Sequence, residues 1–245
     1  MDSADALPAA SLAAVLDRPD VWRGDALSRS HAPGIPSGSS ALDAELPGGG
    51  WPPGALTEIF PAHEGIGELR LLGPALAALV QRGARLVWIA PPYLPYAPAL
   101  AAAAIDPASL LIVRVASPKD ALWAAEQALR SNACGAVLAW PRFAKYADLR
   151  RLQIAAEGGG APAFLFRPEA AAGESSPAAL RIADDTAGGG LALRLLKRRG
   201  APLASPILLP PMPPAARGKY SDRHVDRRSI PVPAARDFPA RVVHA

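Results

Sequence analysis

Five short apolar runs separated by stretches with helical spacing constrain the fold of this chain more than any other feature. The runs lie at residues 55–60, 85–90, 109–115, 136–140 and 162–167. Each run is almost continuously apolar, which is typical of strands that are covered on both faces of a sheet. Because helices join such strands over short links, the pattern predicts right-handed crossovers and a mostly parallel sheet of the α/β class.

The stretches between the runs predict helices at 69–81, 97–105, 117–132 and 145–156. One of them carries clear start signals, since Ser117 is a favoured N-cap residue and Pro118 a favoured residue of the first turn. The last helix is expected to end at the glycines 158–160.

The chain after residue 168 has a different texture. Residues 179–183, 191–200 and 202–209 predict antiparallel strands, and residues 168–178 predict a flexible loop. From about residue 210 onward prolines are frequent and apolar periodicity is weak, which is typical of a disordered segment. We therefore expect a parallel core with an antiparallel C-terminal extension, followed by a disordered tail.

Charge is distributed unevenly along the chain. The net charge is +4, from 26 Lys and Arg and 22 Asp and Glu, and residues 211–245 hold seven of the former and three of the latter. The first 210 residues are balanced at 19 each, so the whole excess lies in the tail. A basic tail suits an acidic protein or nucleic acid as partner, and an equal alternative is a tail that only aids solubility.

The single cysteine, Cys134, excludes an internal disulfide and favours a reducing cytoplasm. The N-terminal residues carry acids where a secretory signal would carry bases. No stretch of about 18 uncharged apolar residues is present, so we expect no membrane span. The four histidines lie far apart in the sequence without metal-ligand spacing. The expectation is a cytoplasmic protein without a metal or other cofactor.

The loop after the first apolar run stands where a nucleotide-binding protein of this class would hold phosphate. Such a loop reads G-x-x-x-x-G-K-[ST], with its lysine on the terminal phosphates and its hydroxyl on magnesium. Gly67 matches the second glycine, but Glu68 replaces the lysine and Leu69 replaces the hydroxyl. The residues of interest in this vestigial loop, AHEGIGEL, are Ala62, Glu64, Gly65, Gly67, Glu68 and Leu69.

These replacements oppose nucleotide binding. Glu68 would place a carboxylate against anionic phosphates, a repulsion of about 4 kcal/mol at a separation of roughly 4 Å and a protein-surface dielectric. Arg70 does not restore the positive charge, because two residues along a helix turn its side chain by about 200°. A dinucleotide motif also fails, since Arg70 stands at its third glycine. Ordinary tight-turn glycines and a retained ligand site are equal alternatives for this loop.

The segment around this loop is similar to the start of the RecA recombinase core. Residues 35–68 read IPSGSSALDAELPGGGWPPGALTEIFPAHEGIGE. RecA-like proteins likewise run from a TGS-ALD segment through a glycine-rich turn into the strand before the phosphate loop. The resemblance continues at low identity to about residue 209. It implies that the strand at 85–90 leads toward a catalytic glutamate and that the strand at 136–140 is the Walker B strand.

The resemblance also indicates which chemical groups are missing. Pro91 and Pro92 occupy the neighbourhood of the catalytic glutamate, and the magnesium-linked aspartate would fall near Ala139 or Trp140. Because the lysine and the hydroxyl of the loop are replaced as well, one site lacks all its catalytic groups. The resemblance therefore implies a pseudo-ATPase without catalytic residues.

A degenerate RecA-like core followed by a basic, Pro-rich tail resembles the ImuA family of translesion DNA synthesis-associated proteins. It resembles SulA, a shorter degenerate relative, less well. The resemblance implies a non-catalytic adaptor in SOS-induced mutagenesis. Its implied partners are an ImuB-like Y-family protein, RecA and an error-prone DNA polymerase in the same complex. Two alternatives stay open: a residual RecA-like NTPase or DNA-binding protein, and a SulA-type inhibitor of cell division.

Three parts are expected along the chain. Residues 1–33 would form an N-terminal helical arm and linker, residues 34–209 the RecA-like core, and residues 210–245 the disordered tail. The arm would contact RecA or a second copy of this chain, or else cover the chain's own core. Its apolar anchors would be Leu12, Val15, Leu16 and Trp22.

Two groups of basic residues are candidate contacts for DNA or a partner. The first group follows the strand at 136–140, at the sheet edge where open parallel sheets bind ligands. The second lies in the strand at 191–200, where alternation would place its members on one face. For both, the alternative is a solvated surface kept soluble by charge. The candidates are Arg142, Lys145, Arg150 and Arg151 with the aromatic Phe143 and Tyr146, and then Arg194 and Arg198.

The loop at 168–178 would contact single-stranded DNA in RecA-like proteins. Here it is short and carries Glu169 and Glu174, which would repel phosphates. Filament-style DNA binding by this loop is therefore not expected.

Overall fold

A computed structural model of the chain describes residues 33–62, 68–115, 117–187, 190–198, 202–203 and 205–210. Residues 1–32 of the predicted arm, with all four of its anchors, lie outside this described part, as do the tail from residue 211 and residues 63–67 of the vestigial loop. The predicted boundaries between the three parts of the chain stay predictions.

The described residues form one eight-stranded sheet with the order β3-β2-β4-β5-β1-β6-β7-β8. From β3 through β6 in this order, neighbouring strands are parallel. β7 then runs antiparallel to β6, and β8 antiparallel to β7. This sheet confirms the predicted α/β class, with a mostly parallel core and an antiparallel C-terminal extension. The strands are β1 (Leu56–Pro61), β2 (Leu86–Ile89), β3 (Leu110–Val113), β4 (Ala136–Ala139), β5 (Ala163–Phe166), β6 (Leu180–Ala187), β7 (Gly190–Lys197) and β8 (Ile207–Leu209).

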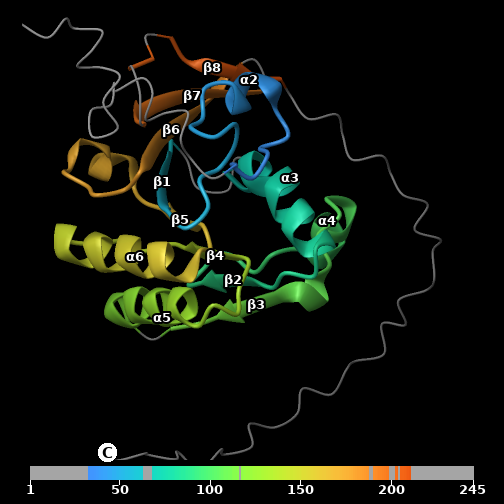
Figure 1. Ribbon diagram of the computed structural model, residues 1–245, viewed down its shortest axis with the longest axis vertical. Coiled ribbons are helices and arrows are strands. Elements are labelled where there is room, and N and C mark those ends of the chain that lie inside the picture. The colour runs from blue at the N-terminus through green and yellow to red at the C-terminus, as the bar shows by residue number, and fades with distance from the viewer. Residues whose placement is uncertain are drawn as a thin grey trace, which may run out of the picture. The chain divides into compact units, whose positions relative to one another are not determined.

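Helices cover both faces of the parallel part of the sheet (Figure 1). On one side lie α3 (Glu68–Gln81) and α4 (Ala97–Ala102), and on the other lie α5 (Pro118–Arg130) and α6 (Tyr146–Gly159). The short helix α2 (Ser40–Asp43) lies near β8. Two single turns of 3₁₀-helix complete the described elements: η1 (Pro107–Ser109) and η2 (Glu169–Gly173).

Side chains that alternate along the strands feed two apolar cores, one under each helix layer. In β1, Ile59 packs on the α3 side and Leu56 on the α5–α6 side, and both are fully buried. Burying one such side chain contributes about 1.5–3 kcal/mol. The near-continuous apolar runs of the sequence are therefore explained, because each strand must present apolar groups to both layers.

The ends of α5 and α6 follow the predicted signals. Ser117 caps α5, since its hydroxyl oxygen accepts a hydrogen bond of 3.2 Å from the backbone N–H of Asp120. Gly160 ends α6 in the left-handed region at φ 70°. Gly159, in the last turn of α6, lies so close to α5 that an added Cβ would collide with the carbonyl of Leu129. The glycine run thus ends α6 and also allows α6 to approach α5 closely.

The prediction of a flexible loop at residues 168–178 is wrong. Glu169–Gly173 form η2, and both Ala171 and Ala178 are buried against the sheet. The segment is ordered because the arginines Arg167 and Arg181 donate hydrogen bonds to it. The local sequence of residues 168–178 does not reveal these hydrogen bonds, because one of the two arginines that donate them belongs to another strand.

The predicted strand at 191–200 is too long. β7 ends at Lys197, and a β-bulge between Arg181 and Ile182 of its partner strand shifts the pairing. Arg198 lies beyond the end of the strand, and the bulge interrupts the alternation of side chains before it. The prediction that Arg194 and Arg198 share one strand face is therefore wrong.

None of the helices in the described ranges has the length and apolar character needed to cross a lipid bilayer.

We expect Gly159→Ala to destabilise the protein by about 1–3 kcal/mol, because the new methyl group meets backbone that cannot move aside. The neighbouring Gly158→Ala is a matched control, since an added Cβ there has nothing within 4 Å. It should raise stability by about 0.5–1 kcal/mol through helix propensity. Urea unfolding followed by tryptophan fluorescence measures both changes, and equal effects of the two substitutions would contradict the close approach.

Candidate functional site

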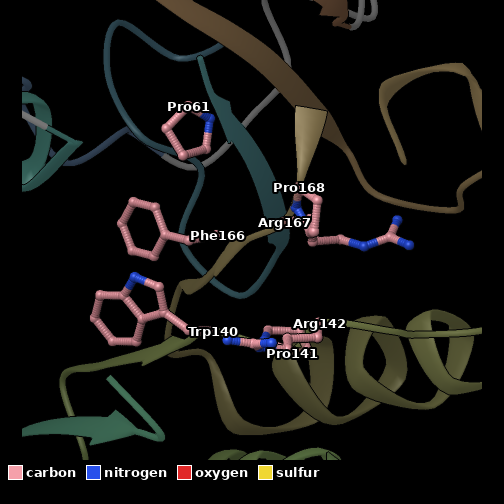
Figure 2. A pocket seen from close by; sticks show the side chains of 7 residues that line it. All are labelled: Pro61, Trp140, Pro141, Arg142, Phe166, Arg167 and Pro168. Atoms are coloured by element: carbon pink, nitrogen blue, oxygen red, sulfur yellow. The ribbon is translucent and has the colours of Figure 1, made fainter. Parts of the chain in front are cut away.

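A small pocket lies at the carboxyl edge of the sheet, where β1, β5 and the chain after β4 come together (Figure 2). Its volume is about 50 Å³, a few times the roughly 10–15 Å³ that one water molecule needs on the same measure. By itself this pocket has room for a small group only. It is lined by Pro61, Trp140, Pro141, Arg142, Phe166, Arg167 and Pro168.

Aromatic rings fill the space beside this pocket. Trp140 stacks on Phe166 with ring centroids 4.7 Å apart and planes 15° apart, and Trp88 meets Trp140 at 5.8 Å and 57°. The three rings come from neighbouring strands, β2, β5 and the end of β4 (Figure 2 shows Trp140 beside Phe166). Each such pair stabilises the fold by about 0.5–1.5 kcal/mol beyond its area burial. Of the two residues near which the RecA resemblance puts an aspartate, Ala139 is buried in β4 and Trp140 is packed between aromatic rings.

The described ends of the vestigial loop serve the fold. The backbone N–H of Ala62 donates to the carbonyl of Asp184 at 3.1 Å and so extends the pairing of β1 with β6. Leu69 is half-buried and packs against the core on the α3 side. Glu68 is the first residue of α3, whereas Glu64, Gly65 and Gly67 lie outside the described residues. A leucine held in the core cannot serve as a magnesium ligand.

A buried carboxylate lies at the centre of the sheet on the α6 side. Glu58 of β1 is fully buried, and its two oxygens accept hydrogen bonds from two arginines. Arg167, directly after β5, donates from Nη1 at 2.6 Å, and Arg181 of β6 donates from Nε at 2.8 Å. β1 lies between β5 and β6, so both cations come from the adjacent strands. Breaking such a pair by removing one partner costs about 3–5 kcal/mol.

The Nη2 groups of both arginines bind the segment that follows β5, and that of Arg167 also binds the chain before α6. Nη2 of Arg167 donates to Glu174 at 2.7 Å and to the carbonyl of Ala144 at 3.2 Å. Nη2 of Arg181 donates to the carbonyl of Ala171 at 3.0 Å. The guanidinium carbon of Arg181 lies 4.9 Å from the centre of the Phe60 ring. These contacts hold η2 and the residues after it against the sheet.

Lys197 of β7 joins the same region. Its ammonium donates to the carbonyl of Ser176 at 2.8 Å. Partial burial and the positive charge of Arg181 lower the pKa of Lys197, and Glu58 acts in the opposite direction. Cations are therefore crowded beneath the segment at 168–178.

The sequence alone does not identify this network, although it contains a signal for it. Glu58, Arg167 and Arg181 are charged residues inside or at the end of otherwise apolar strand runs. Charged residues are almost never fully buried unless they are paired. Such residues on strands that become neighbours indicate a buried ionic cluster, but the strand order is needed to bring them together.

The first group of predicted basic contacts lies on and before α6. Arg142, Lys145 and Arg150 are exposed, and Arg142 also lines the small pocket. Arg151 is exposed but paired, at 2.9 Å from Asp148 and 3.5 Å from Glu126 of α5. The aromatic residues of this group, Phe143 and Tyr146, are 77% and 52% exposed, so neither packs into the core.

The second group lies on the other side of β1, so the two groups do not form one surface. Arg194 is exposed on β7. Arg198 is half-buried, and its Nη1 donates to Glu45 through both the carboxylate, at 2.6 Å, and the backbone carbonyl, at 2.7 Å. Arg198 thus joins the end of β7 to the chain after α2.

Neither a metal cluster nor a reactive thiol stands out in the described part of the chain. Within it, no group of three or more His, Cys, Asp or Glu side chains is placed to hold a metal ion. Cys134 is half-buried, its thiol donates to the carbonyl of Ala128 at 3.1 Å, and burial raises its pKa.

Comparisons with known proteins add little to this geometry. No protein-family model matches the chain, and no curated protein matches it. Among solved structures, the chain is similar to the crystal structure of SulA from Pseudomonas aeruginosa at 26% sequence identity. That match covers 46% of this chain and 97% of the SulA chain, with a TM-score of 0.39. A superposition this loose carries no argument about function.

Replacing Glu58 by Gln should lower the free energy of unfolding by about 3 kcal/mol, because two buried arginines lose their shared counter-charge. Glu169→Gln is the matched control, since Glu169 is exposed and lies in the same region. It should change stability by less than about 0.5 kcal/mol. Chemical denaturation of both variants measures the difference, and a Glu58→Gln protein as stable as the control would disprove the role given to the network.

Cys134 should react slowly with iodoacetamide at pH 8. Its raised pKa leaves less thiolate at that pH than in the unfolded chain, and thiolate is the reactive form. Alkylation rates of the folded protein and of the protein in 8 M urea provide the comparison. Equal rates, or a faster folded protein, would contradict the burial of the thiol.

Proposed function

We propose that this chain is a non-catalytic adaptor in SOS-induced translesion synthesis, where it binds an ImuB-like Y-family protein and RecA beside an error-prone DNA polymerase. The resemblance to the ImuA family supplies the partners. The observation that carries the non-catalytic part is the packing of Trp140 on Phe166, with Leu69 in the core.

Phosphoryl transfer depends on positioning and on electrostatic stabilisation, which metal ions and cationic side chains supply. By the RecA resemblance, the magnesium-linked aspartate would fall near Ala139 or Trp140. Leu69 stands at the position of the hydroxyl, and Glu68 at the position of the lysine. An indole and a leucine stabilise neither magnesium nor developing charge. These residues favour a site whose side chains pack against one another and do not bind a nucleotide.

The exposed surface near this edge supports a binding role. Phe143 and Tyr146 are exposed beside Arg142 and Lys145. Aromatic and arginine side chains carry much of the binding energy at protein interfaces, and large exposed apolar side chains in a cluster mark interaction sites. A partner that covers them would bury apolar surface without any chemistry at the pocket.

Two alternatives from the sequence make different predictions. A residual NTPase would release phosphate from ATP, and Arg70→Ala would abolish that release. Arg70 is half-buried in the wall of a separate cavity of about 440 Å³, together with Ser39, Ser40 and Leu208. A SulA-type inhibitor would cause cell filamentation on overexpression without any effect on mutagenesis.

We expect the full-length protein to capture an ImuB-like protein from a mixture of purified components, and Phe143→Ala with Tyr146→Ala to weaken capture at least about tenfold. The control is Trp123→Ala, which removes an exposed aromatic side chain of α5 outside this group and should leave capture unchanged. Capture is measured by surface-immobilised binding. Capture that fails with the unmodified protein, together with filamentation of cells, would overturn the adaptor proposal in favour of the SulA-type reading.

A further inference from the structure

Three cations lie together beneath residues 168–178, on the α6 side of the sheet. Arg167 is 2% exposed, Arg181 is almost as deeply buried, and Lys197 stands beside them on β7. Figure 2 shows the Arg167 guanidinium directed away from the rings of Trp140 and Phe166. Glu58 is the fully buried carboxylate among them and balances one of the three charges.

The segment above these cations supplies the remaining acceptors. It provides one carboxylate, from Glu174 to Arg167 at 2.7 Å, and two backbone carbonyls, from Ala171 to Arg181 at 3.0 Å and from Ser176 to Lys197 at 2.8 Å. Backbone carbonyls and a carboxylate are the acceptor groups that any acidic peptide carries, and one of these carbonyls lies in the 3₁₀ turn η2. The segment therefore behaves as a peptide ligand that belongs to the same chain.

The contacts between residues 168–178 and the sheet are mainly hydrogen bonds and ion pairs. The apolar contacts of the segment come from alanines alone: Ala171 and Ala172 pack on Phe60 and Ala183, and Ala178, at the end of the segment, packs into the core on the α5–α6 side. The carboxylate of Glu174 is 55% exposed, so water and competing anions reach it. An ion pair that exposed changes an equilibrium by less than about fivefold. Loss of the segment would uncover an aromatic ring beside cations with an unbalanced positive charge.

We propose that Arg167, Arg181 and Lys197 form a receptor for an acidic peptide segment of a partner protein, and that residues 168–178 close this receptor as an internal ligand. This inference rests on the proposed adaptor function in that it requires a protein partner. An incoming segment would replace Glu174 by its own carboxylate and would place its apolar side chains on Phe60. The receptor would thus open only for a segment that competes with the chain's own.

The present contacts favour a peptide over nucleic acid. The acceptors now bound are peptide carbonyls and one carboxylate, which form single directed hydrogen bonds to buried donors. Nucleic-acid backbones are bound instead by many exposed cations that neutralise successive phosphates. Two of the three cations here are buried, and Glu58 lies among them.

The closing contact is tested by hydrogen–deuterium exchange on the purified full-length chain. Glu174→Gln should speed exchange across residues 168–178 by about three- to fivefold, the range of a half-exposed ion pair, and leave exchange in β1 and β5 unchanged. Glu169→Gln, in the same segment, should leave every region unchanged. Equal exchange in Glu174→Gln and in the unmodified protein would overturn the closing role.

The receptor is tested with a fluorescein-labelled peptide that copies residues 168–178, PEAAAGESSPA. We expect it to bind Glu174→Gln about threefold more tightly than the unmodified protein, because the internal competitor is weakened. Lys197→Gln should reduce that binding, and a peptide with glutamine in place of its second glutamate should bind both proteins about three- to fivefold more weakly. Equal binding of the two peptides, or displacement by a short oligothymidine at equal concentration, would overturn the peptide receptor. Both experiments use this chain alone, so their failure leaves partner capture by the exposed aromatic surface intact.

Discussion

The fully buried carboxylate of Glu58 governs how the middle of this molecule is built. A charge on the central strand, with no exposed surface, must be paired in place. Its two oxygens face one arginine from each neighbouring strand, at 2.6 and 2.8 Å. Each arginine also has an Nη2 group that does not bind Glu58, and these two groups donate hydrogen bonds to the chain that follows β5. The order of residues 168–178 is therefore a consequence of one acid on β1.

The opposite side of the sheet is organised by aromatic packing. Trp88, Trp140 and Phe166 form a continuous contact across neighbouring strands and leave a pocket of only about 50 Å³ at the carboxyl edge. In open α/β sheets this edge is where ligands bind. At this edge the described side chains pack against one another. The sheet thus carries the buried ionic network on its α6 side and the aromatic cluster on its α3 side, each beside an apolar core.

The sequence was sufficient for the elements whose signals are local. The parallel strands, the start of α5 at Ser117 and the end of α6 at Gly160 all follow from apolar runs and capping residues. It was insufficient where distant residues meet. The order of 168–178 depends on Arg181, and the register of β7 depends on a bulge in its pairing with β6. For the candidate site, the absence of acidic and hydroxyl groups at Trp140 and Leu69 was readable from the sequence. The pairing of Arg198 with Glu45, 153 residues apart, was not.

We propose that packing fills the carboxyl edge of the sheet and that the protein does not bind Mg·ATP. The most direct measurement is the thermal unfolding midpoint of the purified full-length protein with and without 5 mM Mg·ATP. A ligand that binds only the folded state at 100 times its Kd stabilises it by about 2.7 kcal/mol, which shifts the midpoint by several degrees. The account predicts no shift relative to Mg²⁺ with inorganic phosphate. A saturable rise of several degrees that requires both Mg²⁺ and ATP would contradict it.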